Sequence, residues 1–167
     1  MISVDHVRTM ARYNRWQNQS LYGAADTLTG AERMKDRGAF FGSIHNTLSH
    51  ILWGDQQWMS RFAPETVQKP PALVRTGGGN YPDWDELKQR RIAFDQTILD
   101  WADAMAPSWM EGDLVWYSGI AKADVSKPKW LTVTHFFNHQ THHRGQVHAM
   151  LTAAGAKPDD TDLFLMP

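Results

Sequence analysis

The 167-residue sequence contains no cysteine. Disulfide bonds, zinc sites built from thiolates and a cysteine nucleophile are therefore all excluded. The opening stretch MISVDHVRTMARYNRW lacks the apolar core of a secretory signal. No stretch approaches the roughly 20 apolar residues that a membrane-spanning helix requires. We therefore expect a cytoplasmic protein that does not enter a membrane.

Concentrated charge is also missing. The 17 basic and 18 acidic side chains nearly cancel, and the basic residues form no run. Nothing in this balance favours binding to nucleic acid or to an anionic membrane. Apolar residues, in contrast, make up 42% of the chain, and eight of them are tryptophans. This content suits one domain over residues 1–167, with a core or cleft walled by large flat rings.

Four segments have the periodicity of amphipathic helices. The first two are Val4–Leu28 and Ser43–Phe62. The third begins after Asp83 and runs to about Met105. The last has Pro128 in its first turn and Gly155 at its C-terminal cap. We expect an irregular connection over Ala31–Gly42 between the first two. The sequence therefore predicts an all-α fold, a four-helix bundle.

Two further segments are distinctive. The Pro- and Gly-rich stretch Ala63–Pro82 predicts a long crossover between the second and third helices, either passive or functional. The stretch Asp113–Val125 has β-branched and aromatic residues around Ser118-Gly119, which predicts a short β-hairpin before the last helix. The acidic and then apolar tail after Pro158 is expected to fold back on the bundle.

Histidine is concentrated in the last helix. The stretch from Thr134 to Met150 holds five of the eight histidines. His139 and His143 are four residues apart and share one helix face, and His135 lies within about 40° of His139. Two imidazoles at this spacing can hold one cation. A buried network of histidines and amides is the alternative, because unpaired buried polar groups are costly.

The second helix offers one histidine in a comparable setting. Small or neutral polar residues surround His50 on its face, whereas His45 lies well off that face. Bundles build metal sites from side chains on facing helices, so His50 could meet His139 and His143 in the core. Three nitrogen ligands would leave one position of a tetrahedral ion open, as catalytic sites do. The absence of Glu-x-x-His and His-Glu-x-x-His argues against a di-iron carboxylate centre and a zincin protease.

Several pieces of the sequence carry a family resemblance. They are YNRWQNQSLY at Tyr13–Tyr22, HNTLSHILWGDQQWMSRF at His45–Phe62, FFNHQTHHRGQVHAML at Phe136–Leu151, and the C-terminal TDLFLMP. In this order and at this length they resemble the DinB family of damage-inducible, metal-binding four-helix proteins. The resemblance covers the first, second and fourth helices and the tail. The third helix and the Gly-rich loop carry no motif.

The resemblance implies one divalent cation, most often zinc or nickel, bound by His50, His139 and His143. Some relatives transfer low-molecular-weight thiols such as bacillithiol or mycothiol, and others isomerise maleylpyruvate with such a thiol. Many have no assigned activity. Homodimers are common in the family, so we expect a homodimer.

Two functional hypotheses follow. The first is a metal-dependent enzyme, a thiol S-transferase or a small hydrolase, acting on a small molecule at the open metal position. The second is a non-catalytic metal-binding or stress-response module. On the enzyme hypothesis, the residues expected to line the pocket or to support the ligands are Asn14, Trp53, Gln57, His135 and Gln146. None of these is an obvious general base, so no catalytic residue is assigned.

Overall fold

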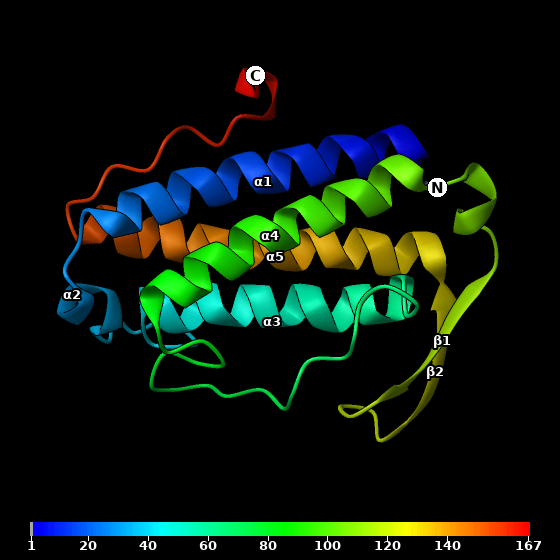
Figure 1. Cartoon of the computed structure of the whole chain (residues 1–167), viewed down its shortest axis with the longest axis horizontal. Coiled ribbons are helices and arrows are strands. Elements are labelled where there is room, and N and C mark those ends of the chain that lie inside the picture. The colour runs from blue at the N-terminus through cyan, green and yellow to red at the C-terminus, as the bar shows by residue number, and fades with distance from the viewer. Residues whose placement is uncertain (1) are drawn as a thin grey trace.

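A computed structural model describes residues 2–167, and four long helices dominate it (Figure 1). They are α1 (Val4–Asp26), α3 (Ile44–Phe62), α4 (Trp84–Ala104) and α5 (Lys129–Ala153). The smaller elements are helix α2 (Gly30–Met34), the antiparallel hairpin of β1 (Asp113–Ser118) and β2 (Ala123–Pro128), and the 3-10 turns η1 (Pro107–Met110) and η2 (Leu163–Leu165). Within residues 2–167 no helix is long and apolar enough to cross a membrane. The predicted all-α bundle with a hairpin before its last helix is confirmed.

Side-chain caps fix where three of the long helices begin. Ser3 and Ser43 accept hydrogen bonds from the backbone amides at the start of α1 and α3, each at 3.1 Å. Asp83 does the same for α4 at 2.7 Å. Each cap satisfies an amide that has no partner inside its helix. At the other end of α5, Gly155 adopts the left-handed conformation with φ +82°, which glycine favours.

The directions of the helices explain the long crossover. In Figure 1, α1 and α5 run one way while α3 and α4 run the other. Because α3 and α4 are parallel, the chain after Phe62 must return along the whole bundle before α4 can begin. The returning segment is fastened to α3: His45 Nε2 donates to the Tyr81 carbonyl at 2.8 Å, and the Gly78 amide donates to Asn46 Oδ1 at 2.8 Å.

Three details differ from the sequence-based expectations. Helix α1 ends at Asp26 rather than Leu28, and Thr29 caps the start of α2. The expected irregular connection Ala31–Gly42 therefore overlaps helix α2, whose five residues are too few for a periodic pattern. Pro128 ends β2 and precedes α5, so it is not in the first turn of that helix.

The core consists of two apolar clusters. One is built around residues such as Leu48, Leu87 and Leu151, and the other lies toward the hairpin and includes Met59 and Phe136. Buried polar residues occupy the sequence positions between the two clusters on all four long helices. This polar layer consists of Asn14, Asn18, Asp55, Arg91, Asp95, Gln140 and Arg144.

The polar layer is bonded across the bundle. Arg91 on α4 lies 2.7 Å from Asp55 on α3 and 2.8 Å from Asp95 one turn along its own helix. Asp55 also accepts a hydrogen bond from Gln140 on α5 at 2.9 Å. With Arg144, the layer holds two cations and two anions, so its formal charges cancel. Pairing of this kind is what makes buried charges tolerable.

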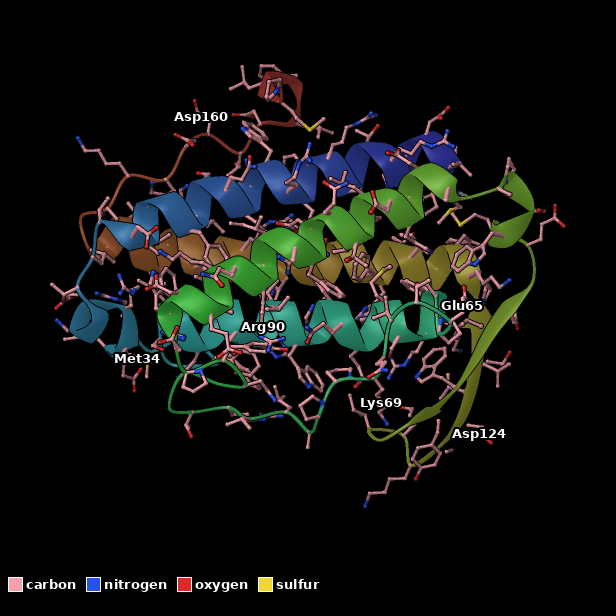
Figure 2. The ribbon with its side chains drawn as sticks, in the orientation of Figure 1. Met34, Glu65, Lys69, Arg90, Asp124 and Asp160 are labelled. Carbon is pink, nitrogen blue, oxygen red and sulfur yellow. The ribbon has the colours of Figure 1, made fainter. Side chains whose placement is uncertain are left out.

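The C-terminal tail folds back along α1, as Figure 2 shows near the labelled Asp160. The Tyr13 hydroxyl donates to the Thr161 carbonyl at 2.6 Å, and the Gln17 amide donates to the Asp160 carbonyl at 3.0 Å. The tail therefore covers one side of α1 in the described structure.

Candidate metal centre

Helix α5 contacts the bundle in two directions. Gln140 and Arg144 point into the polar layer, and their places in the core fix the rotation of the helix. His139 and His143 each come one residue earlier, about 100° around the helix, and so face the seam with α3. Their ring centroids are 4.6 Å apart.

His50 on α3 meets these two rings. Its Nε2 atom lies 3.1 Å from Nε2 of His139, and its ring centroid is 4.7 Å from that of His143. One nitrogen from each of the three rings lies within 4.8 Å of the others. The structure thus brings together the three predicted ligands from two facing helices. We call them the three-histidine cluster.

Gly54 makes this approach of α3 and α5 feasible. A β-carbon at Gly54 would lie 2.7 Å from Cε1 of His139, closer than such contacts occur in proteins. Glycine is therefore required here by the position of the His139 ring rather than by its own backbone conformation.

All three histidines are held neutral. Burial, together with the neighbouring histidines, lowers the pKa of His50 and of His139 to about 3. Burial also lowers the pKa of His143. Among residues 2–167, no carboxylate joins this group of potential ligands. At neutral pH the cluster therefore offers uncharged nitrogen lone pairs, the form that binds metal ions.

The geometry of the cluster fits a transition-metal ion. Nitrogens bound tetrahedrally to zinc at about 2.1 Å lie about 3.4 Å from one another, close to the separation of the two Nε2 atoms. Nδ1 of His50 is buried and has no hydrogen-bond partner within the described chain. A cluster of three neutral imidazoles with unused bonding capacity is suited to a further, cationic partner.

Gln146 orients one member of the cluster. Its Oε1 atom lies 2.9 Å from Nδ1 of His143, so that nitrogen carries the proton and donates. The lone pair of His143 is then on Nε2, which stays free to bind a cation. Such a partner on the non-ligating nitrogen is the usual companion of a metal-bound histidine. Gln146 was among the predicted supporting residues.

Phe41 forms a wall of the site that the sequence did not predict. Its ring stacks on His50 with centroids 3.9 Å apart and meets His143 edge-on at 5.5 Å. Phe41 lies in the connection before α3, where no periodic pattern signals burial. Beyond it, Arg75 from the crossover lies over the Phe41 ring at 6.0 Å.

Three other predicted residues lie beside the cluster. Trp53 stacks near His50 with ring centroids 6.0 Å apart, and its indole nitrogen donates to the Pro71 carbonyl at 2.8 Å. His135 lies one turn from His139, with centroids 6.0 Å apart. Gln57 is half-buried on the same face of α3 as His50, and its side chain forms no hydrogen bond within residues 2–167.

Asn14 is placed elsewhere. Its amide donates to Asp95 at 3.0 Å and its oxygen accepts from Arg144. Asn14 therefore belongs to the polar layer rather than to the surroundings of the three-histidine cluster. Its position on the apolar stripe of α1 showed that it is buried, but could not show which partners it meets.

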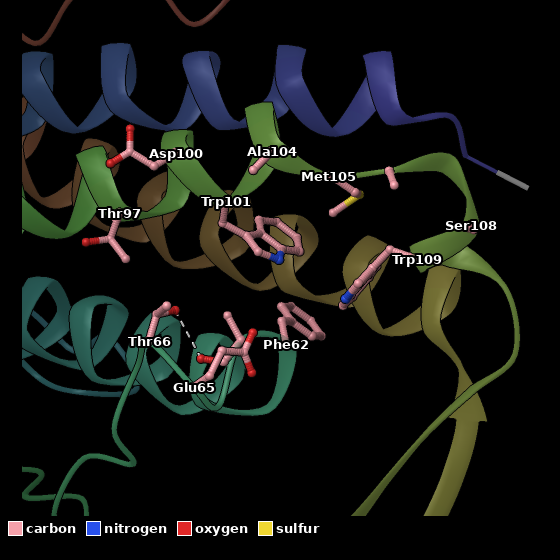
Figure 3. Close-up of a pocket in the computed structure, with 12 residues that line it drawn as sticks. Phe62, Glu65, Thr66, Thr97, Asp100, Trp101, Ala104, Met105, Ser108 and Trp109 are labelled. Carbon is pink, nitrogen blue, oxygen red and sulfur yellow. Dashed lines mark hydrogen bonds between the residues drawn. The ribbon is translucent and has the colours of Figure 1, made fainter.

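A separate cleft of about 770 Å³ opens at the hairpin end of the bundle (Figure 3). The rings of Trp101, Trp109 and Phe62 line it, with Glu65 and Asp100 as its charged groups. No member of the three-histidine cluster lines it. The cleft and the candidate metal centre are therefore distinct features.

Comparison with known proteins agrees with this geometry. The family model described as "DinB family" matches residues 3–167. The chain is similar to "Protein DinB" of Bacillus subtilis (strain 168), at 28% identity over 172 aligned positions, covering 96% of this chain and 94% of the relative. The match spans all four long helices, including both that carry the histidines. The chain belongs to the DinB family.

Proposed function

We propose that His50, His139 and His143 bind one divalent cation, with zinc and nickel as the leading candidates. The observation that carries the proposal is the convergence of three neutral imidazole nitrogens within 4.8 Å, from two facing helices. Imidazole suits both metals. Gln146 supports the site by holding His143 in the tautomer that leaves Nε2 free.

We propose further that the protein is an enzyme, a thiol S-transferase or a small hydrolase. Three protein ligands are typical of catalytic sites, whereas structural sites are normally closed by a fourth. A cation bound there would lower the pKa of a thiol or of water toward neutrality. The chain's own contribution is to hold the ligands rigidly and to wall the site with Phe41 and Trp53, which limits the access of water.

A comparison of three protein samples tests catalysis. Zinc- or nickel-loaded protein, chelated protein and His143→Ala are assayed for conjugation of low-molecular-weight thiols and for ester and amide hydrolysis. We expect turnover only with the loaded wild type. If the turnover of the loaded wild type does not exceed that of His143→Ala in either assay, the proposal that the protein is an enzyme is wrong. The non-catalytic metal-binding module then becomes the better account.

We also propose that the protein is a homodimer joined through helix faces that do not carry the histidines. Ile92 on α4 is 70% exposed, which leaves a large apolar side chain on such a face. Light scattering at tens of micromolar should give twice the mass of the chain. A monomer mass at that concentration would overturn this part of the proposal.

A further inference from the structure

The cleft at the hairpin end of the bundle has no part in the proposed function. It opens where α4 inclines away from α3, so that the two helices diverge toward their C-terminal ends (Figure 1). Its volume of about 770 Å³ lies within the range of about 300–1,000 Å³ that is usual for small-molecule sites. Thr97, Trp101 and Met105, spaced four residues apart on one stripe of α4, form one side of it.

Three aromatic rings give this cleft a rigid, flat wall. Phe62 and Trp101 are stacked, with ring centroids 5.4 Å apart and planes 11° apart. Trp109 meets both of them edge-on, at 5.7 and 5.6 Å. Phe62 is buried, whereas the two tryptophans are half-buried and keep part of their indole surface open. Because the faces of aromatic rings are electronegative, such a wall attracts cations as well as apolar groups.

The charged side chains that line the cleft are both acidic. Glu65 lies on the α3 side, across from Trp101, and Asp100 lies on α4 (Figure 3). Neither carboxylate forms a salt bridge within residues 2–167. The turn that carries Glu65 is held in place, because the amides of Thr66 and Val67 donate to the Ala63 carbonyl at 3.0 and 2.9 Å. The cleft therefore combines ring surface with negative charge of one sign.

The chain already places one cation of its own against this group of rings. The ammonium of Lys129 lies 5.2 Å from the ring centroid of Trp109. Lys129 does not line the cleft, so it does not neutralise the charge there. Across residues 2–167, no basic side chain lies over the rings of Trp101 or Phe62. These two rings are thus left for a cation from outside the chain.

The proposed homodimer would leave the cleft open. Ile92, whose exposure suggests a dimer face, precedes Trp101 by nine residues on α4. At about 100° per residue, nine residues correspond to two and a half turns, so the two side chains point to opposite sides of the helix. A partner that covers Ile92 therefore does not cover the side of α4 that carries Trp101.

We propose that this cleft binds an organic cation, namely a protonated amine with an apolar or aromatic body. The body packs against Trp101 and Phe62, where it gains apolar contact and an attraction between its charge and the ring faces. The ammonium group pairs with Glu65, and Asp100 adds negative potential at the rim. The site is separate from the three-histidine cluster and requires no metal ion.

Calorimetric titration with three matched ligands tests the proposal. The ligands 4-phenylbutylamine, 4-phenyl-1-butanol and 4-phenylbutyrate share one apolar body and carry a positive, no and a negative charge. Chelated protein is used, so that no metal ion can bind the amine. Wild type should bind the amine about tenfold more tightly than the alcohol, and the acid most weakly. Butylamine, which lacks the ring, should bind at least about tenfold more weakly than 4-phenylbutylamine.

Glu65→Gln tests the role of charge. It should weaken binding of the amine about threefold and leave binding of the alcohol unchanged, because a pairing at an exposed carboxylate is weak. Asp103→Asn is the matched control, since Asp103 is an exposed acid at the same end of α4 that does not line the cleft. It should leave both affinities unchanged. Glu65 is itself exposed, so its replacement should not disturb folding.

Nuclear magnetic resonance of the indole N–H groups locates the ligand. The signals of Trp101 and Trp109, assigned by their loss in Trp101→Phe and Trp109→Phe, should shift on titration with 4-phenylbutylamine. The signal of Trp53, beside the three-histidine cluster, should not shift. Far-UV circular dichroism checks that both variants fold, and Trp109→Phe alone suffices for the assignment if Trp101→Phe does not fold.

Three results would overturn the proposal. The first is equal affinity of wild type for the amine and the alcohol, or no binding of the amine. The second is an unchanged affinity for the amine in Glu65→Gln. The third is an indole shift at Trp53 without one at Trp101 or Trp109. None of these results bears on metal binding by the three histidines, and a failure of metal binding would leave this proposal intact.

Discussion

Single residues determine whether the three imidazoles can converge. His50 and His143 are both less than 10% exposed, and Phe41 covers the rings of both. The cluster has no room for a side chain at position 54, where the His139 ring fills the space that a β-carbon would occupy. The positions of the ligand rings therefore depend on Gly54, which is not itself a ligand.

The first prediction concerns Gly54→Ala. The added methyl group must displace the His139 ring, which should weaken zinc binding at least tenfold, equivalent to about 1.4 kcal/mol. Competition titration with a zinc-chelating dye measures the affinity. Gly23→Ala is the matched control, because Gly23 is an exposed helical glycine with no neighbour within 4 Å. Equal zinc affinity in both variants would contradict the account of Gly54.

The second prediction concerns pH. In the folded metal-free protein the pKa of His50 and of His139 is about 3, whereas in the unfolded chain it returns to about 6.5. Between these two pH values the unfolded state therefore binds more protons than the folded state does. The contribution of both histidines to the free energy of unfolding is full above about pH 6.5 and falls as the pH drops toward 3. The free energy of unfolding of chelated protein, measured with urea, should be lower at pH 5 than at pH 7.

The control for the pH prediction is His139→Gln. Removing one of the two depressed histidines should reduce the slope of stability against pH between 7 and 5. Burial raises the pKa of Asp55 and of Asp95, but both residues are present in wild type and in His139→Gln, so the difference between the two slopes reports on His139. Identical slopes in wild type and His139→Gln would show that the cluster is not the source of the acid sensitivity.

At the scale of elements, α5 places functional side chains on two adjacent sides. One side places Gln140 and Arg144 in the polar layer, and the adjacent side presents His139 and His143 to α3. The layer connects all four long helices through Asp55, Arg91 and their partners. Its buried charges require partners, so the layer specifies the register and rotation of α3 and α5 and hence the relative positions of the ligands.

Asp55→Ala is the third prediction. It leaves Arg91 without one of its two anions and Gln140 without its acceptor, and breaking a buried ion pair costs about 3–5 kcal/mol. Urea denaturation should show a loss of that size. Asp100→Ala, at an exposed position on α4, should change the free energy of unfolding by less than about 0.5 kcal/mol. A small effect of Asp55→Ala would mean that the layer is not a major source of stability.

The sequence predicted the elements whose patterns repeat and missed those that do not. Helices α1, α3 and α4 have apolar stripes and begin at side-chain caps, and the hairpin has its β-branched and aromatic residues, whereas α2 is too short for a repeating pattern. The layer residue Asn14 could be recognised as a polar interruption of an apolar stripe, but its partners Asp95 and Arg144 are distant in sequence. Arg91 follows Leu87 by one turn, a spacing that could have signalled its burial.

The candidate site was predictable for the same reason. His139 and His143 share a helix face by spacing alone, and His50 stood out on the second helix by its small or neutral polar neighbours. The family resemblance then implied all three as ligands. Phe41 could not be predicted, because it lies in an irregular connection.

At the scale of the whole molecule, we expect the bundle to form without a metal ion. Two apolar clusters and the polar layer join the long helices without the three histidines. The fourth prediction is that chelation leaves the far-UV helical signal unchanged while lowering the midpoint of thermal unfolding, because a ligand bound only by the folded state stabilises it. Loss of helical signal on chelation would show instead that the cation is structural.

The central claim is that one cation binds to His50, His139 and His143. Anomalous diffraction from crystals of zinc-loaded protein tests it most directly. We predict a single strong peak in the seam of α3 and α5, with one nitrogen from each of the three rings about 2.1 Å away. A peak coordinated by His135 or His45, with His50 turned elsewhere, would contradict the claim, as would crystals of loaded protein without an anomalous peak in this seam.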